Sequence, residues 1–312
     1  MDISFIKYKI SLISQYFIIN AKNAKFRSCK GFVIYNTLCV LVIFTACNPD
    51  LDYTVRGYTQ KIIVEGTVET GEYPRVYLTL NVPLWKTLDS ATVLDHVIRY
   101  AKVSVSNGIT TEILTSKWDK THFPPYVYTA TEMKGIEGRN YSLKVEYSGY
   151  TVYSNTLLPT ATTIDSVHFQ PSPATDTLKI MSVWLNIDKR NETGFRIFTK
   201  KQQDKRYIET PIVFNNDLIL NGVQKFNLSP QPEKTDSSYR EGKYFAVGDI
   251  VDIKLCTIDK VSTLFFNDLS LYSSLSDNIF TSEVKPIKSN ITEPGFGIWY
   301  GSGVRYFRCV VK

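Results

Sequence analysis

The sequence predicts a mainly β protein, in which an N-terminal β-sandwich is followed by a second β-rich part with one amphipathic helix. Of the 312 residues, 43% are hydrophobic and only 21% are charged, a composition that excludes a disordered or collagen-like chain. Short runs of alternating or β-branched residues recur from residue 60 onward. Turn-forming residues separate the runs, and Asn107-Gly108 is the strongest of the short hairpin signals.

Seven strands are expected between residues 60 and 156, a number typical of an Ig-like or prealbumin-like β-sandwich. They are expected at residues 60–69, 75–81, 101–106, 111–115, 126–131, 141–147 and 150–156. Because side chains alternate between the two faces of a strand, one face of each strand should build the core. The residues predicted to form this core are Ile62, Val64, Val76, Leu78, Val103, Val105, Leu143 and Val145. The alternation fails at residues 84–97, where we expect a long loop or a short helix.

A domain boundary is predicted near residue 160, where a short linker separates the sandwich domain, residues 59–160, from a β-rich domain, residues 161–312. Further strands are expected at residues 164–169, 178–187, 194–199, 206–214, 246–257 and 297–311. Between Asp259 and Leu275, apolar residues recur at close to helical spacing, and Asp259 is placed to cap the N-terminus of that helix.

The N-terminal region, residues 1–46, has the pattern of a secretory signal. It carries six Lys or Arg against one acid, Asp2, and an apolar stretch of about 15 residues follows Lys30. That stretch is too short for a comfortable membrane span. Its end, Phe44-Thr45-Ala46-Cys47, resembles the bacterial lipobox, which predicts that Cys47 is lipidated and becomes the new N-terminus. A single-pass anchor with an incidental cysteine is the alternative.

Residues 47–58 are expected to form a polar tether between the lipid and the fold. Several acyl chains on Cys47 would hold the protein stably at a membrane without spanning it. Residues 1–29 are more than such a signal needs, and we interpret them as a candidate over-extension of the gene start. That interpretation requires a start codon other than Met, because no Met lies between Met1 and Met133.

The basic charge of the chain lies in the signal. The formal net charge is +6, but removing residues 1–46 leaves 30 basic and 29 acidic residues. The part that folds is therefore electrically balanced, which argues against nucleic acid as a partner.

No catalytic, cofactor or metal motif occurs in the sequence, and we expect a protein that is not an enzyme. The histidines, His96, His122 and His168, lie far apart without partners at ligand spacing. Asp249 and Asp252 have an odd separation on an expected strand, so their side chains should point to opposite faces. An uncharacterised hydrolase remains the alternative, because catalytic groups can assemble in space.

Two further cysteines, Cys256 and Cys309, follow Cys47 in the mature chain. They could form one disulfide in an oxidising compartment. The alternative is two buried thiols in separate strands.

Aromatic residues give the one positive indication of a binding surface, with 20 Tyr, 17 Phe and 4 Trp. Tyr and Trp combine apolar area with a hydrogen-bonding group, which suits a glycan or peptide ligand or a protein partner. The candidate contacts are Phe123, Tyr126, Trp85, Trp299 and Tyr300. The alternative for each of them is packing within a β core, where the same residue types are favoured.

Four segments, taken in order, resemble a Bacteroidota family of outer-membrane lipoproteins of unknown function. The segments are Ile63-Val64-Glu65-Gly66, the run from Gly138 to Val145 followed by Gly149-Tyr150, Val247-Gly248-Asp249-Ile250-Val251, and a closing run from Asp277 to Trp299 that includes Ser289-Asn290 and Gly295-Phe296-Gly297. The sequence departs from the family pattern at Thr292-Glu293-Pro294 and at Trp299, where Phe is usual.

The resemblance implies a lipid-anchored protein of the outer membrane, on its periplasmic or its cell-surface face. Members of the family are commonly encoded beside TonB-dependent receptors, so it implies an accessory or ligand-capturing partner of such an uptake receptor. A surface lipoprotein that adheres to glycans is the alternative. The resemblance brings no catalytic residues.

Overall fold

The computed structural model describes residues 59–83, 89–120, 122–173, 175–187, 193–210, 222–230, 244–275 and 286–312. The predicted signal, Cys47, the tether and Trp85 lie outside the described residues. Within the described ranges, no helix is long and apolar enough to cross a membrane.

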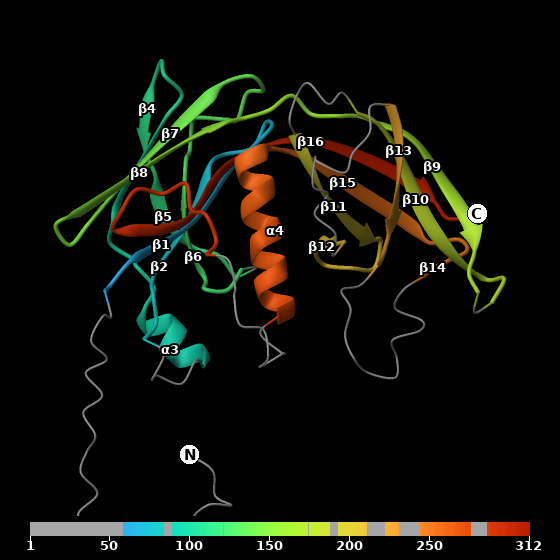
Figure 1. Ribbon diagram of the computed structural model, residues 1–312, viewed down its shortest axis with the longest axis horizontal. Helices are drawn as coiled ribbons and strands as arrows, with labels where there is room; N and C mark the ends of the chain where they lie inside the picture. Colours follow the sequence, from blue (N-terminus) through green and yellow to red (C-terminus); the bar gives the residue numbers. More distant parts are fainter. Residues whose placement is uncertain are drawn as a thin grey trace, which may run out of the picture. The chain divides into compact units, whose positions relative to one another are not determined.

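The described chain is mainly β, as predicted, and its two helices are α3 (Ser90–Asp95) and α4 (Lys260–Leu275) (Figure 1). The strands of the first half are β1 (Ile62–Glu69), β2 (Arg75–Leu80), β3 (Lys102–Ser106), β4 (Thr111–Ile113), β5 (Thr115–Trp118), β6 (Tyr126–Thr129), β7 (Asn140–Tyr147) and β8 (Tyr150–Leu157). The strands of the second half are β9 (Ile164–Pro171), β10 (Leu178–Ile187), β11 (Thr193–Lys201), β12 (Ile208–Glu209), β13 (Gly222–Leu228), β14 (Phe245–Ala246), β15 (Ile250–Asp259) and β16 (Gly295–Val310).

These strands form three sheets. The large sheet has eight strands in the order β12-β11-β15-β16-β1-β2-β6-β5. A second sheet has the order β4-β3-β7-β8, and a third is built on β10, which pairs with β9, β13 and β14. The first and last strands, β1 and β16, pair in parallel at the centre of the large sheet, from Ile62 opposite Gly295 to Glu69 opposite Ser302.

Two hydrophobic cores lie on the same face of the large sheet, which we call the inner face. Strand alternation places Val64 and Val76 on this face together with Trp299 of β16, which is opposite Gly66. The same alternation, followed through β15 to β11, places Leu255 and Ile197 there. The opposite face, which we call the helix face, packs against α4 (Figure 1).

The first core lies between the inner face and the sheet of β3, β4, β7 and β8. All eight residues predicted for it are buried, each with at most 2% of its surface exposed. The second core lies between the inner face and the sheet of β9, β10 and β13, and it includes Met181, Val183 and Phe226. Strand β16 contributes to the first core through Trp299, and Val311, directly after it, contributes to the second.

The linker between the two halves crosses the inner face over glycines of β16. A Cβ on Gly301 would lie 2.3 Å from the carbonyl oxygen of Leu157, and one on Gly303 would lie 2.4 Å from that of Pro159. Only glycine at these two positions lets the two backbones approach so closely.

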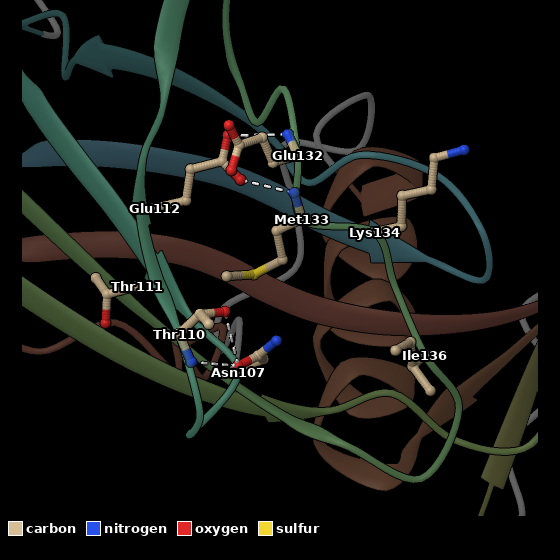
Figure 2. A pocket seen from close by; sticks show the side chains of 8 residues that line it. All are labelled: Asn107, Thr110, Thr111, Glu112, Glu132, Met133, Lys134 and Ile136. Carbon is tan, nitrogen blue, oxygen red and sulfur yellow. Dashed lines mark hydrogen bonds between the residues drawn. The ribbon is translucent and has the colours of Figure 1, made fainter.

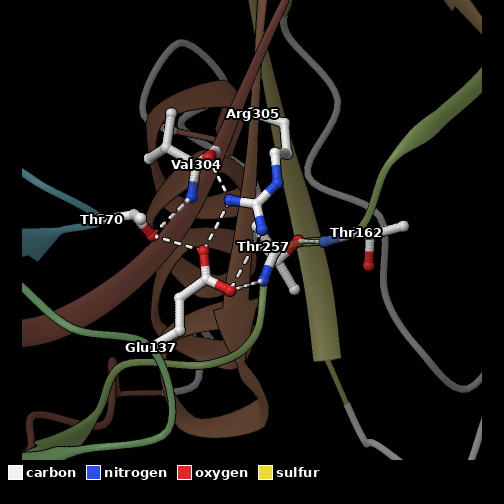
Figure 3. A network of polar contacts seen from close by, with 7 residues as sticks. Thr70, Glu137, Thr162, Thr257, Val304 and Arg305 are labelled. Carbon is white, nitrogen blue, oxygen red and sulfur yellow. Dashed lines mark hydrogen bonds and ion pairs between the residues drawn. The ribbon is translucent and has the colours of Figure 1, made fainter.

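A polar network fixes the linker where it crosses (Figure 3). The carboxylate of Glu137 accepts hydrogen bonds from Arg305 at 2.6 and 3.2 Å and from the Ala161 N–H at 3.2 Å. Burial raises the pKa of Glu137, but the hydrogen bonds from Arg305 and Ala161 outweigh burial and hold that pKa below its usual value. Beside it, the Thr162 N–H donates to Thr257 Oγ1 at 2.9 Å. The linker is thus bonded to β15 and β16.

Most of the expected local structure is confirmed. The Asn107-Gly108 turn joins β3 to β4, with Gly108 at a φ of +84°. Helix α3 lies within residues 84–97, and α4 occupies the expected range with Asp259 Oδ1 accepting from the Ser262 N–H at 2.8 Å. The expected strand 111–115 differs, because it divides at the buried Leu114 into β4 and β5, which belong to different sheets.

The division at residue 160 stays a prediction. The two cores lie on either side of it in the chain, apart from Ile291 and Trp299, which return to the first core. The large sheet takes strands from both halves.

Replacing Gly301 with alanine should destabilise the protein by about 1–3 kcal/mol, because the new Cβ meets backbone atoms of the linker that cannot rotate away. Urea unfolding of the detergent-solubilised chain measures this change. Gly108→Asn is the control, since a Cβ there meets nothing within 4 Å and Asn tolerates positive φ. We expect the control to change stability by less than about 0.5 kcal/mol. Equal stability of Gly301→Ala and the wild type would contradict the described linker path.

Candidate functional site

Exposed aromatic side chains gather where β5 and β6 end, at one edge of the large sheet. Trp118 of β5 is directly opposite Tyr126 of β6, and their rings meet edge to face at 4.9 Å and 87°. Trp118 is 56% exposed and Phe123, in the connection between the strands, is 54% exposed. Such ring pairs are more favourable than their buried area alone accounts for.

An arginine completes this group. The segment after α3 runs beside β2, with the Leu80 N–H donating to His96 O and the Ile98 N–H donating to Leu78 O. Directly after it, the guanidinium of Arg99 lies 4.9 Å from the ring centre of Tyr126. This cation–π contact orients a solvent-exposed positive charge beside the two rings. We call Arg99, Trp118, Phe123 and Tyr126 the aromatic cluster.

The connection that carries Phe123 is held to the sheet from its other face. The ring of His122 stacks on Tyr77 at 3.7 Å, and the Tyr77 hydroxyl donates to Asp119 at 3.2 Å. Burial, and then the charge of Asp119, raise the pKa of Tyr77 to about 12. The phenol therefore stays protonated and keeps this hydrogen bond at neutral pH. Strand alternation places Tyr77 and Tyr126 on opposite faces, so the Tyr77–His122 stack supports the cluster from behind.

The aromatic cluster can bind a ligand through ring faces and one positive charge. The exposed rings offer apolar area, and Arg99 offers several N–H donors for an anionic group. Within the described ranges, no group of three or more His, Cys, Asp or Glu side chains could hold a metal ion. The arrangement is suited to recognition of a flat, partly apolar ligand.

The sequence identified part of this cluster. Phe123 is exposed as expected, Tyr126 is half-buried, and Trp85 lies outside the described residues. Trp118 and Arg99 were missed, although Trp118 ends the strand before the connection that carries Phe123. Its position next to the Phe123–Tyr126 segment could have identified Trp118 from the sequence. For Arg99 no sequence signal existed, because its contact depends on how the chain returns from α3.

Trp299 and Tyr300 were predicted as candidate ligand contacts, but the structure gives both of them a structural role. Trp299 is 0% exposed, and its Nε1 donates to Tyr141 O at 2.9 Å in the first core. Tyr300 lies on the helix face, with its ring 5.1 Å from that of Phe266 and its hydroxyl accepting from Arg196 at 3.0 Å. Along residues 297–304 of β16 every residue is buried or half-buried, so packing covers both faces of this part of the strand.

For Cys256 and Cys309 the disulfide alternative is wrong, and the structure shows two separate thiols. Cys256 and Cys309 are both free. In the β15–β16 register, Cys309 is opposite Val251 and Cys256 is opposite Val304, five positions apart. Five positions correspond to about 17 Å along a strand, far beyond the reach of a disulfide. Burial raises the pKa of each thiol to about 11, which keeps both protonated and poorly nucleophilic.

The carboxylates and histidines singled out in the sequence are not brought together. Asp249 pairs with Lys201 at 3.2 Å, whereas Asp252 pairs with Arg308. His96 contacts Thr92 O, and His168 contacts Ser166 on β9. Each of these side chains therefore has its own local partner.

A pocket of about 450 Å³ lies between the β3–β4 turn and the segment from Glu132 to Ile136 (Figure 2). Its Glu112 is already engaged, because one oxygen accepts from the Thr131 and Glu132 N–H groups at 2.6 and 3.2 Å and the other accepts from the Met133 N–H at 2.7 Å. Burial raises the pKa of Glu112, but these backbone donors outweigh burial and lower it below its usual value. Glu112 therefore holds the segment in place.

Comparisons with known proteins add little. No protein-family model matches the chain, and no curated protein matches it. Among solved structures, a chain titled "Cytokine receptor complex - Crystal form 1A" is 7% identical with a TM-score of 0.22, over 64% of this chain and 85% of its own. A chain titled "Anomalous substructure of Titin-A168169" is 8% identical with a TM-score of 0.19, over 64% of this chain and 90% of its own. Likenesses of this size carry no argument about fold or function.

Replacing Glu112 with glutamine should cost about 1 kcal/mol at neutral pH, because the amide leaves at least one of the three N–H donors without its charged acceptor. Since folding lowers the pKa of Glu112, the wild-type stability advantage is fully present above the usual glutamate pKa of about 4.3. It is lost as the pH falls through the folded-state pKa. Urea unfolding at neutral and acidic pH measures this, with the neighbouring exposed Glu132→Gln as control. A constant difference across that pH range would contradict the assignment.

Proposed function

We propose that this protein is a membrane-anchored, non-catalytic lipoprotein that captures a ligand as an accessory partner of a TonB-dependent outer-membrane receptor. The observation that carries the capturing role is the exposed aromatic cluster. Exposed rings that gather at one place beside an arginine are typical of a surface that binds a partner, because such residues are enriched at interfaces. The anchor and the receptor rest on the lipobox at Cys47 and on the family resemblance.

A lipid anchor at Cys47 would make such a binding surface useful to a receptor in the same membrane. Eleven residues, 48–58, separate Cys47 from the first described residue. Fully extended they would span at most about 40 Å, so the fold would stay close to the membrane. A binding surface confined to that layer raises the local concentration of its ligand at a receptor in the same membrane.

The chemistry of the cluster favours a ligand with a flat apolar face and an anionic group. An acidic sugar fits this description, because its ring can stack on Trp118 while its carboxylate pairs with Arg99. The rings Trp118 and Tyr126 are already held edge to face, which reduces the entropy lost on binding.

A detergent pull-down of the tagged protein from its native outer membrane tests the receptor partnership. We expect a β-barrel receptor of the TonB-dependent class to copurify, and mass spectrometry of the N-terminal peptide to find acylated Cys47. Glycan binding without a receptor would favour the surface adhesin instead. An unmodified Cys47 would overturn the lipid anchor.

Variants of the aromatic cluster test the capturing role. Trp118→Ala and Arg99→Ala should each weaken binding of trigalacturonic acid about tenfold or more, as measured by titration calorimetry. Tyr150→Ala on β8 is the matched control, because Tyr150 is 52% exposed and lies outside the cluster. An equal loss in the control, or no binding by the wild type at about 1 mM, would rule out this ligand class for the cluster.

A further inference from the structure

The third sheet carries a second surface, on the side of β9, β10 and β13 that points away from the second core. Met181, Val183 and Leu185 of β10 face that core, so Ser182 and Trp184 face outward. The strand register places Ser166 and Lys225 on either side of Trp184, and His168 and Asn227 on either side of Ser182. The outward residues that matter here are Ser166, His168, Gln170, Ser182, Trp184, Lys225 and Asn227, which we call the outer platform.

Trp184 departs from the rule for such a face. A sheet covered on one side only is expected to carry polar side chains on its other side. Trp184 is half-buried there, and its Nε1 is enclosed without a hydrogen-bond acceptor in the described part of the chain. Tryptophan N–H groups usually have an acceptor when they are buried. Local departures of this kind are most often found where a protein binds something.

The side chains around Trp184 are mainly neutral hydrogen-bonding groups. The ring of His168 meets the indole at 5.7 Å and 71°, and His168 Nε2 lies 3.1 Å from Ser166 Oγ. Ser182 Oγ donates to Asn227 Oδ1 at 2.9 Å. Across β10, Lys225 Nζ donates to Gln170 Oε1 at 3.2 Å, so the only cation of the platform is bonded to an amide.

The platform therefore offers one large ring, two amides, the hydroxyl of Ser166 and an imidazole, with little net charge, whereas Ser182 is fully buried beneath it. Asp165, the nearest acid on β9, is the extra residue where the register shifts between Trp184 and Leu185. A peptide segment with charged side chains would find few partners of opposite charge here, and one lysine is too little for a phosphate-rich membrane surface. A sugar without ionised groups matches the platform best, because its C–H face stacks on indole and its hydroxyls pair with amides.

We propose that the outer platform is a binding site for a neutral oligosaccharide, centred on Trp184. Asn227 is opposite Ser182, two residues from Trp184 on β10, and its oxygen accepts from Ser182, which leaves its N–H₂ group as a donor for a ligand. Gln170 likewise keeps its N–H₂ group while its oxygen accepts from Lys225. The register places Asn227 opposite Ser182 and Gln170 opposite Ile180, so the two donors follow Trp184 along β10 on its two sides. This spacing suits hydroxyls of successive units of a sugar chain that stacks on the indole.

This site is independent of the aromatic cluster. The platform belongs to the sheet built on β10, whereas the cluster belongs to the β5–β6 edge of the large sheet. The cluster favours an anionic ligand through Arg99, whereas the platform favours a neutral one. Variants in one should leave the other unchanged, so failure of either proposal can be recognised separately.

The test is titration calorimetry of the full chain in detergent with cellohexaose, mannohexaose and laminarihexaose. We expect at least one hexasaccharide to bind with a dissociation constant of about 1 mM or tighter. Trp184→Ala should weaken that binding about tenfold or more, and Trp118→Ala should leave it unchanged. No binding of any of the three, or loss of binding in Trp118→Ala, would overturn the proposal.

A second variant keeps the test decisive if Trp184→Ala does not fold. Gln170 and Asn227 are exposed, and the double variant Gln170→Ala, Asn227→Asp removes both amide donors while an oxygen at position 227 can still accept from the buried Ser182. This double variant should therefore keep the wild-type urea midpoint. It should weaken hexasaccharide binding about tenfold. Wild-type affinity in this folded double variant would show that the platform does not bind the sugar.

Discussion

The parallel pairing of β1 with β16 is the contact on which the rest of the fold depends. It brings the last strand of the chain between the first strand and β15, and so joins both halves into one eight-stranded sheet. Trp299 of β16 then fills the first core over Gly66, where a Cβ would lie 2.6 Å from the indole, while Val311 reaches the second core. Without this pairing the large sheet would divide between β16 and β1, and the first core would lose Trp299.

Residues from two of the segments that carry the family resemblance hold β16 in this position. The N-terminal part of β16, before Ser302, has no β15 residue beside it. Side chains there make the backbone hydrogen bonds that a neighbouring strand would otherwise make. Ser289 Oγ bonds both the N–H and the carbonyl of Gly297, and the Asn290 amide does the same for Trp299. Tyr141 accepts the Trp299 indole N–H through its carbonyl. These residues satisfy backbone groups that burial would otherwise leave unpaired, so they specify the fold and lie apart from the exposed rings.

Local pattern identified most of the strands. It missed β13, and it did not show that the strands expected at 111–115 and 246–257 each divide between two sheets. Alternation identified the core residues of β1, β2, β3 and β7, because each strand is covered on one face by a core. In β16 the pattern is hidden by Gly295, Gly297, Gly301 and Gly303, whose spacing reflects contacts with Val152, Val64 and the linker. Burial of Trp299 follows from a partner more than 200 residues away in the chain. The Arg99–Tyr126 contact was equally out of reach, since it depends on the path after α3.

On the helix face, the charged side chains of Arg196 and Lys254 form ion pairs that stabilise the fold. The aromatic cluster, which lies elsewhere, is the surface suited to ligand recognition. Arg196 is held by both oxygens of Glu209 at 2.6 and 2.7 Å and stacks on Phe266 of α4 at 3.9 Å. Lys254 contacts both oxygens of Glu69 at 2.8 Å. Breaking such pairs would leave an uncompensated buried charge, so a ligand could not recruit these groups without a large cost. Arg99 differs because its guanidinium is exposed over a ring, and a ligand at the aromatic cluster can reach its charge.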